Sequence, residues 1–244
     1  MKKCMHYKWN DISVLLVACF LSLMLVAGAG LAATNVDFEI VILADASRSV
    51  DAKEYARQRD GYASMFSSPD FYNNYLVQNR INTIAVTFVY WSSPKFIKPV
   101  VSWTVIDSVD SSQAFGTAIR KASPVEGSFL KDSRPFDGTT APGSAIAFGV
   151  QSLSDNHFEG DRKIIVISGD GIENDGIATN IARDEALAKG VTAISAIAIG
   201  SEALKKWFSS HVQGGKNSFT LRVKDYQELP EAIQGIFQRI LSPI

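Results

Sequence analysis

Cysteine is scarce in this sequence: the chain has two, Cys4 and Cys19, and both lie near the N-terminus. Beyond them the chain can form no disulfide, no thiolate metal site and no cysteine nucleophile. The folded part of the protein must therefore be stabilised by its hydrophobic core.

Histidine is also scarce, and outside the N-terminal segment only His157 and His211 occur, both in polar stretches. The chain contains neither a G-x-S-x-G nor an H-E-x-x-H motif, which excludes the hydrolases that those motifs mark. A metal-dependent hydrolase that activates water remains an alternative, with Asp45 or Asp170 as the candidate base. Our expectation is a protein that is not an enzyme.

Charge of one sign does not dominate, since 24 basic side chains face 25 acidic ones and the formal net charge is −1. There is no long charge run, no low-complexity tract and no internal repeat. A nucleic-acid partner is not expected, because such binding needs a basic surface. The nucleotide-binding patterns G-x-G-x-x-G and G-K-[ST] are also missing, so no small-molecule substrate is evident.

A long apolar run occurs at the N-terminus, where SVLLVACFLSLMLVAGAG follows three lysines. Basic residues, an apolar run and the small residues GLAAT follow one another in the order of a secretory signal. We predict a signal peptide at 1–33, cleaved after Ala32 or Ala33, and one domain at 34–244. The protein is then exported, to the periplasm or the extracellular space. An uncleaved signal is the alternative, and it would be the chain's attachment to a membrane.

Segments of strand and helix periodicity alternate over the rest of the chain. The apolar runs predict strands at 36–45, 81–91, 95–105, 162–171, 191–200 and 217–223. Helical patterns and capping residues predict helices at 51–66, 111–122, 141–153, 180–190, 203–212 and 229–241. The third strand follows a short SSP link and contains Pro99, so we expect it to pair antiparallel at a sheet edge. The predicted fold is α/β, with three layers: a doubly wound, mostly parallel sheet with one antiparallel edge strand, of Rossmann-like type.

Oxygen-bearing side chains follow several of the predicted strands. DASRS ends the first strand and supplies Asp45, Ser47 and Ser49, while the fourth strand ends at Asp170. DGTTAPGSAI brings two threonines to the start of the third helix. Ligands of such sheets bind beyond the carboxyl ends of the strands. Carboxylate and hydroxyl oxygens suit Mg²⁺ or Mn²⁺, with Ca²⁺ less favoured, and neutral hydroxyls leave the ion able to accept an anionic ligand from outside.

Two other interpretations of these residues remain open. Asp and Ser at the end of a strand are also ordinary capping residues for the helix that follows. The acid-rich GDGIENDG could form a calcium loop with Asp170, Glu173, Asn174 and Asp175, although it lacks the usual spacing of such loops.

DASRS, GTTAPGSAI and ISGDG, each at a strand end or a helix start, resemble the three motifs of von Willebrand factor type A (VWA) domains. The resemblance covers nearly all of residues 36–241. It is nearest to bacterial exported VWA-like proteins of a family of unknown function, which share the SGDG pattern and a first helix similar to YARQRDGY.

This resemblance implies a metal-ion-dependent adhesion site (MIDAS) whose ligands are Asp45, Ser47, Ser49, Thr140 and Asp170. Thr139 is the alternative to Thr140. The implied function is binding of a protein partner through an exposed Asp or Glu of that partner. Arg48 departs from the pattern, because many members have glycine there. A structural domain with a non-functional metal site is the remaining alternative.

Overall fold

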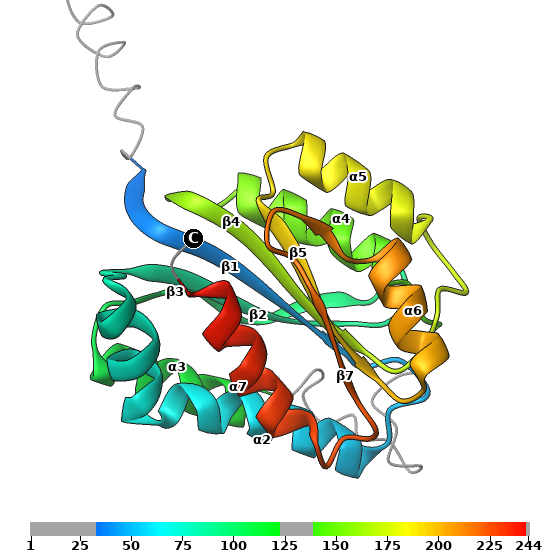
Figure 1. The fold of residues 1–244 in the computed structure, drawn as a ribbon, viewed down its shortest axis with the longest axis horizontal. Helices are drawn as coiled ribbons and strands as arrows, with labels where there is room; N and C mark the ends of the chain where they lie inside the picture. Colours follow the sequence, from blue (N-terminus) through cyan, green and yellow to red (C-terminus); the bar gives the residue numbers. More distant parts are fainter. Residues whose placement is uncertain (1–32, 123–138, 243–244) are drawn as a thin grey trace, which may run out of the picture. The chain divides into compact units, whose positions relative to one another are not determined.

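A mixed sheet forms the centre of the fold in the computed structural model, which describes residues 33–122 and 139–242 (Figure 1). Its strands are β1 (Thr34–Asp45), β2 (Ile84–Trp91), β3 (Ile97–Ile106), β4 (Phe158–Gly169), β5 (Ala193–Ile199), β6 (Gly214–Gly215) and β7 (Thr220–Val223). Their order is β3-β2-β1-β4-β5-β6, and β7 pairs with β5. The β1–β2, β4–β5 and β5–β7 pairs are parallel. This mostly parallel sheet confirms the predicted α/β class.

Helices cover both faces of the sheet (Figure 1). One face carries α2 (Ala52–Ser67), α3 (Val109–Lys121) and α7 (Leu229–Ile240). The other carries α4 (Pro142–Ser154), α5 (Thr179–Ala188) and α6 (Glu202–His211). The fold therefore has the three predicted layers.

Strand β1 shows why the first apolar run is nearly continuous. Ile40 and Ile42 enter the core under α2, α3 and α7, whereas Val41 and Leu43 enter the core under α4, α5 and α6. Alternate side chains of a strand point to opposite faces, so a strand that is covered on both sides is apolar at every position. All four of these side chains are completely buried.

Strand β3 lies at the edge of the sheet and pairs antiparallel with β2, as the sequence predicts. Pro99 lies opposite Val89, next to an irregularity in the register of the two strands. An edge position and a break in the ladder are the places where a residue without an N–H is tolerated.

Several elements differ from the predictions. A π-helical turn (Phe71–Leu76) and a 3₁₀ turn (Val77–Asn79) follow α2, in a stretch whose polar residues hide any helical period. The two-residue β6 consists of glycines, which give no side-chain signal. Strand β4 begins at Phe158, four residues before its predicted start.

Other predictions fall outside the described residues. The predicted signal peptide lies there except for Ala33. Among the described helices, none combines the length and the apolar character that crossing a membrane requires.

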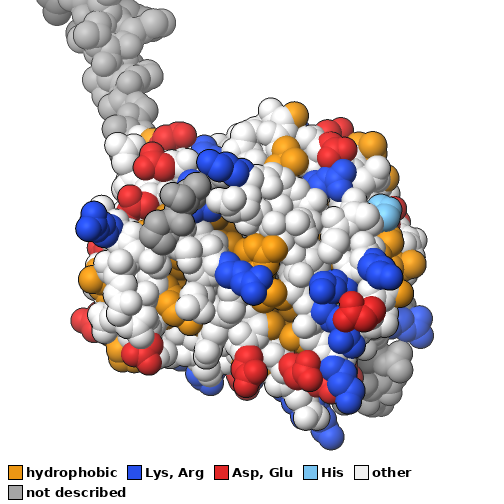
Figure 2. All heavy atoms as spheres, in the orientation of Figure 1, with side chains coloured by type: hydrophobic (Ala, Val, Ile, Leu, Met, Phe, Trp, Pro, Cys, Tyr) orange, Lys and Arg blue, Asp and Glu red, His pale blue; other side chains and the backbone are white. Residues whose placement is uncertain are grey.

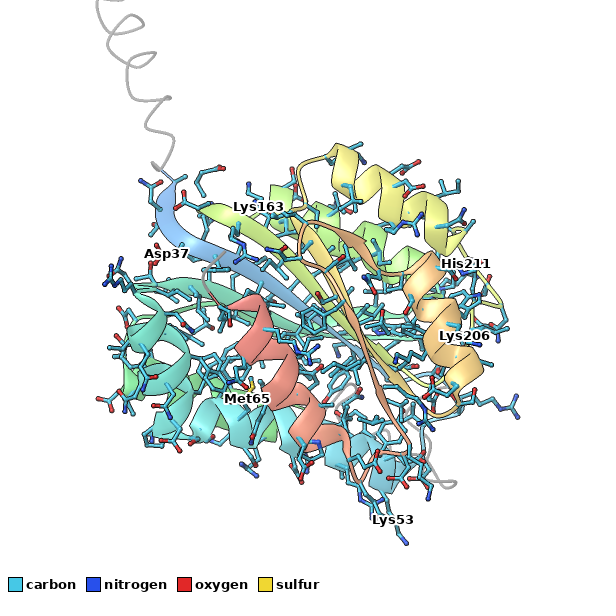
Figure 3. The ribbon with its side chains drawn as sticks, in the orientation of Figure 1. Asp37, Lys53, Met65, Lys163, Lys206 and His211 are labelled. Atoms are coloured by element: carbon cyan, nitrogen blue, oxygen red, sulfur yellow. The ribbon has the colours of Figure 1, made fainter. Side chains whose placement is uncertain are left out.

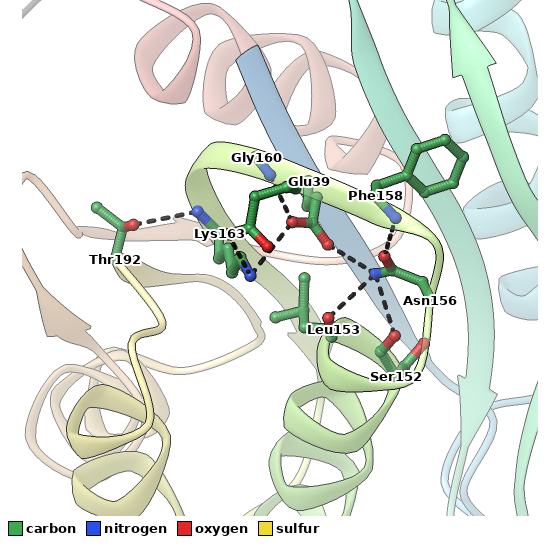
Figure 4. Close-up of polar contacts among 9 residues, drawn as sticks. Glu39, Ser152, Leu153, Asn156, Phe158, Gly160, Lys163 and Thr192 are labelled. Atoms are coloured by element: carbon green, nitrogen blue, oxygen red, sulfur yellow. Dashed lines mark hydrogen bonds and ion pairs between the residues drawn. The ribbon is translucent and has the colours of Figure 1, made fainter. Parts of the chain in front are cut away.

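A buried polar cluster holds the beginning of β4 against β1 (Figure 4). Glu39 of β1 has no exposed surface, and it accepts hydrogen bonds from Asn156 Nδ2 at 2.6 Å and from the Gly160 N–H at 2.8 Å. Lys163 Nζ lies 3.5 Å from the same carboxylate. Because these contacts satisfy the buried charge, the cluster is a structural one. It lies at the end of the sheet marked by Asp37 and Lys163 in Figure 3, whereas Lys53 marks the opposite end.

The surface agrees with the balanced composition. Basic and acidic side chains are interspersed across the face shown in Figure 2, around a central group of apolar ones. This face therefore has no uniformly basic area of the kind that would bind nucleic acid.

Candidate metal centre

The candidate site begins where β1 ends. Asp45 is the last residue of this strand, and its side chain is completely buried. The Ser47 N–H donates to Asp45 Oδ1 at 2.7 Å, and the Asp170 N–H at the end of β4 donates to Asp45 Oδ2 at 3.3 Å. The Asp45 carboxylate therefore connects the ends of two neighbouring strands.

Two serine hydroxyls extend this connection to the second carboxylate. Ser49 Oγ donates to Asp170 Oδ1 at 2.5 Å, and Ser47 Oγ lies 3.1 Å from Ser49 Oγ. A hydroxyl has one hydrogen to donate, and Ser49 gives its hydrogen to Asp170, so Ser47 is the donor in the Ser47–Ser49 contact. Four of the five predicted ligands thus form one continuous hydrogen-bonded group.

The fifth predicted ligand, Thr140, lies beside this group. A Cβ added to Gly171 would meet Thr140 Cγ2 at 3.3 Å and Thr140 Oγ1 at 3.4 Å, so the Thr140 side chain packs against the residue that follows Asp170. The Thr140 N–H donates to Asn174 Oδ1 at 2.8 Å, and the Asn174 N–H donates to the Thr140 carbonyl at 3.0 Å. Thr139, in contrast, is exposed and donates to Asp175 Oδ2 at 2.7 Å. Thr140 is therefore the threonine that lies against the Asp170 segment.

The carboxylates of the following loop do not converge on a second site. Glu173 accepts hydrogen bonds from the N–H and the hydroxyl of Thr179 at the start of α5. Asp175 accepts from Thr139 and from the Gly176 N–H. Each carboxylate has its own partners within the chain, which argues against the calcium-loop interpretation.

Burial makes the ionised form of both carboxylates, Asp45 and Asp170, less favourable. Burial first, and then the neighbouring Asp170, raise the pKa of Asp45 from 3.8 to about 7. Burial also raises the pKa of Asp170, against the hydrogen bonds from Ser49 and Tyr226. No ion pair between two described residues includes either aspartate. Two neighbouring acids without a cationic partner in this part of the chain form a site that favours a bound cation.

Tyr226, which sequence reasoning missed, completes the wall of the site. It lies between β7 and α7, and its hydroxyl donates to Asp170 Oδ2 at 3.2 Å. Burial, and then the charges of Asp45 and Asp170, raise its pKa well above the usual range. The phenol therefore stays protonated and remains a donor to Asp170. A single tyrosine far along the chain gives no local signal for such a contact.

A second missed feature is a buried bridge beneath the site. Gln58 of α2 is fully buried, and its Nε2 donates to the Asp45 carbonyl at 2.7 Å. Ser168 of β4 donates to Gln58 Oε1 at 2.8 Å. The bridge fixes α2 against the ends of the two strands that carry the aspartates. Gln58 is part of the YARQRDGY pattern on which the family resemblance rests. That pattern marks the segment but does not indicate the hydrogen-bond partners of Gln58.

The donor set fits a hard divalent cation. Asp45, Ser47, Ser49, Thr140 and Asp170 supply only carboxylate and hydroxyl oxygens, which suit Mg²⁺ and Mn²⁺. The described residues contain no group of three or more His, Cys, Asp or Glu side chains that could hold a metal. A site in this part of the chain would therefore need other oxygen ligands as well, and the predicted one draws on hydroxyls.

Comparison with known proteins identifies the family. Residues 35–241 match DUF1194, described as a protein of unknown function. The chain belongs to the DUF1194 family. No curated protein sequence matches this DUF1194 chain.

Solved structures show which fold this DUF1194 chain shares. Proximal thread matrix protein 1 (PTMP1) from the mussel byssus matches with a TM-score of 0.61 and 19% identity, over 84% of this chain and 48% of PTMP1. A second PTMP1 structure, described as having a zinc-occupied MIDAS motif, matches with a TM-score of 0.61, 20% identity and the same coverage.

The pilus adhesin SpaC from Lactobacillus rhamnosus GG also matches, with a TM-score of 0.56 and 13% identity, over 84% of this chain and 30% of SpaC. The DUF1194 chain thus spans about half the length of PTMP1 and less of SpaC. Both neighbours are VWA-domain proteins, which confirms the predicted VWA fold.

Proposed function

We propose that this protein is an exported binding module that holds a divalent cation at its candidate metal centre and captures an acidic side chain of a protein partner. The proposed ligands are Asp45, Ser47, Ser49, Thr140 and Asp170. Mg²⁺ or Mn²⁺ is the proposed ion, with Ca²⁺ less favoured. The proposed domain is residues 34–244, released from the signal peptide at 1–33 into the periplasm or the extracellular space.

One observation carries this proposal: two buried neighbouring carboxylates are bridged by serine hydroxyls, and neither forms an ion pair with a basic side chain of the described residues. Without a cation, the pair holds a proton near neutral pH, because the pKa of Asp45 is raised to about 7. A divalent ion would replace that proton and remove the repulsion between Asp45 and Asp170. The hydroxyls of Ser47, Ser49 and Thr140 would add neutral oxygen ligands. When bound, the ion would supply positive charge for an acidic group from outside.

The surroundings of the site support binding over catalysis. His157 is exposed at the beginning of β4, at the opposite end of this strand from Asp170. His211 closes α6, where its ring stacks on Trp207 with centroids 4.8 Å apart. No hydrogen bond between described residues joins either imidazole to Asp45 or Asp170, which argues against a histidine acting as the base of a hydrolase at this site. The similar structures of a matrix protein and an adhesin point the same way.

Capture of partners in magnesium and in chelator tests this function. The purified protein, Asp170→Asn and the control Thr139→Ala are immobilised and exposed to proteins of the native cell envelope. We expect a partner to be retained by the wild type and the control in Mg²⁺, released by chelator, and not retained by Asp170→Asn. Replacing the partner's exposed Asp or Glu by its amide should abolish retention. A partner that stays bound in chelator, or that binds after this replacement, would contradict the proposal.

A further inference from the structure

Exposed apolar side chains follow Asp170 of the candidate metal centre closely in sequence. The described residues contain four exposed large hydrophobics, namely Val77, Ile172, Ile177 and Ile181, with exposed fractions of 53%, 54%, 43% and 48%. Three of them lie within ten consecutive positions that begin two residues after Asp170. Single exposed apolar residues are common on protein surfaces, but a group of them next to a polar site often marks a contact surface.

The loop from β4 to α5, at the right of the view in Figure 1, carries Ile172 and Ile177, and Ile181 follows in the first turn of α5. Hydrogen bonds hold it in place. Its Asn174 exchanges two bonds with Thr140, and its Asp175 accepts a bond from Thr139. The Ile177 N–H donates to Ser144 Oγ at 3.2 Å, which fixes the end of the loop to α4.

Close backbone packing also limits how this loop can move. A Cβ added to Gly143 of α4 would lie 2.0 Å from the Ile177 carbonyl oxygen, so the two backbones are in direct contact. Gly176 has a φ of +82°, a conformation that favours glycine. Ile172 and Ile177 are thus held at the surface by a fixed loop, and Ile181 by the helix that follows it. A partner would bind them without first ordering the loop.

We propose that Ile172, Ile177 and Ile181 form an apolar contact surface, the isoleucine surface, for the partner whose acidic side chain reaches the metal centre. This inference rests on the proposed function and specifies the partner further. The bound segment carries an Asp or Glu with a large apolar residue close to it in sequence. A purely acidic segment fits the site less well, because it would leave the isoleucines exposed to water.

The charges of the loop favour the same kind of bound segment, one that carries a single acid together with apolar residues. The loop carries Glu173 and Asp175, and hydrogen bonds inside the chain already occupy both carboxylates. They offer little to a basic partner, and they would repel a segment with several acids. One acid at the metal centre, accompanied by apolar residues over the loop, is the arrangement with the least repulsion.

A random peptide library displayed on phage is the probe for this surface. The purified full-length protein is used for selection in Mg²⁺, with chelator elution. The affinity of each enriched peptide is then measured by fluorescence anisotropy. Besides the wild type, the measurement uses Ile172→Ser with Ile177→Ser, and Val77→Ser as the matched control for an exposed apolar residue elsewhere. These exposed positions should tolerate serine without loss of folding, which thermal unfolding checks.

We expect enriched peptides to pair an acidic residue with a nearby apolar one. The double variant should weaken their binding about tenfold, while Val77→Ser should leave it unchanged. Peptides that need only the acid and bind the double variant equally well would overturn the isoleucine surface and leave the proposed function standing.

Two further results would also decide the question. Failure to enrich any magnesium-dependent peptide would overturn both proposals. A concentration-dependent dimer of the wild type that the double variant does not form, measured by sedimentation, would assign the surface to a second copy and overturn the proposed occupant.

Discussion

Replacing Asp45 by asparagine should stabilise the metal-free protein while removing its metal site. The Asp45 carboxyl is fully buried, and its pKa is raised to about 7 by burial and by Asp170. Between pH 4 and 7 the folded protein therefore holds a proton that the unfolded chain has released. Stability falls with rising pH wherever the folded state binds more protons. Ionised Asp45 thus destabilises the fold fully above pH 7 and hardly at all below pH 4.

The size of this effect follows from the pKa of Asp45. A rise from 3.8 to about 7 corresponds to about 4 kcal/mol at most, at 1.36 kcal/mol per pKa unit. Asparagine keeps an acceptor for the Ser47 N–H but loses the weaker bond from the Asp170 N–H, a cost of about 1 kcal/mol. The net gain is about 2 to 3 kcal/mol at pH 8, or roughly 5 to 10 °C in Tm for a domain of this size.

Urea and thermal unfolding in chelator at pH 8 and at pH 4.5 measure this difference. Asp45→Asn should exceed the wild type at pH 8, and the gap should shrink strongly at pH 4.5. Asp184→Asn, which changes an exposed carboxyl on α5, is the control and should have little effect. In Mg²⁺ at a thousandfold excess over Kd the order should reverse, because only the wild type gains binding energy, about 4.1 kcal/mol, which exceeds the gain expected for the variant. A variant that is no more stable than the wild type at pH 8 in chelator would refute the reasoning.

Two further substitutions test the supports of the site. Gln58→Leu removes the donor to the Asp45 carbonyl and leaves the Ser168 hydroxyl without its acceptor. We expect calorimetry to show a metal affinity about tenfold lower or more. The metal affinity of Gln58→Glu, which keeps only the acceptor, should also fall. Unchanged metal affinity in both variants would show that the bridge does not position the site. Glu39→Gln removes the charge that faces Lys163 at the far end of the sheet. It should lower the free energy of unfolding by about 1 to 3 kcal/mol and leave metal affinity unchanged, so a loss of affinity would contradict the separation of the two clusters.

The sequence predicts the layers of this fold better than its small elements. Strand β1 is apolar at successive positions because helices cover both of its faces, and an unbroken apolar run is a local pattern. Pro99 marks the edge strand for an equally local reason, its missing N–H. The π-helical turn at Phe71–Leu76 and the glycine strand β6 depend on contacts with distant residues, so no local pattern indicates them.

The candidate site also contains some residues that could be predicted from the sequence and others that could not. Asp45, Ser47, Ser49 and Asp170 stand at strand ends, where sheet topology alone brings them together. Tyr226 and Ser168 reach the site through contacts across more than fifty residues of sequence. Thr139 and Thr140 are adjacent in sequence, and they are told apart by their burial, their hydrogen bonds and the packing of Thr140 against Gly171. A residue's chemistry is readable from sequence, whereas its partner across the fold is not.

Calorimetric titration with a divalent cation tests the central claim most directly. Mg²⁺, Mn²⁺ and Zn²⁺ are titrated into the purified wild type, Asp45→Asn, Asp170→Asn and Thr139→Ala. We predict saturable binding of one Mg²⁺ or Mn²⁺ by the wild type and by Thr139→Ala, and no binding by either aspartate variant. Absence of binding by the folded wild type, or binding that persists in both aspartate variants, would contradict it.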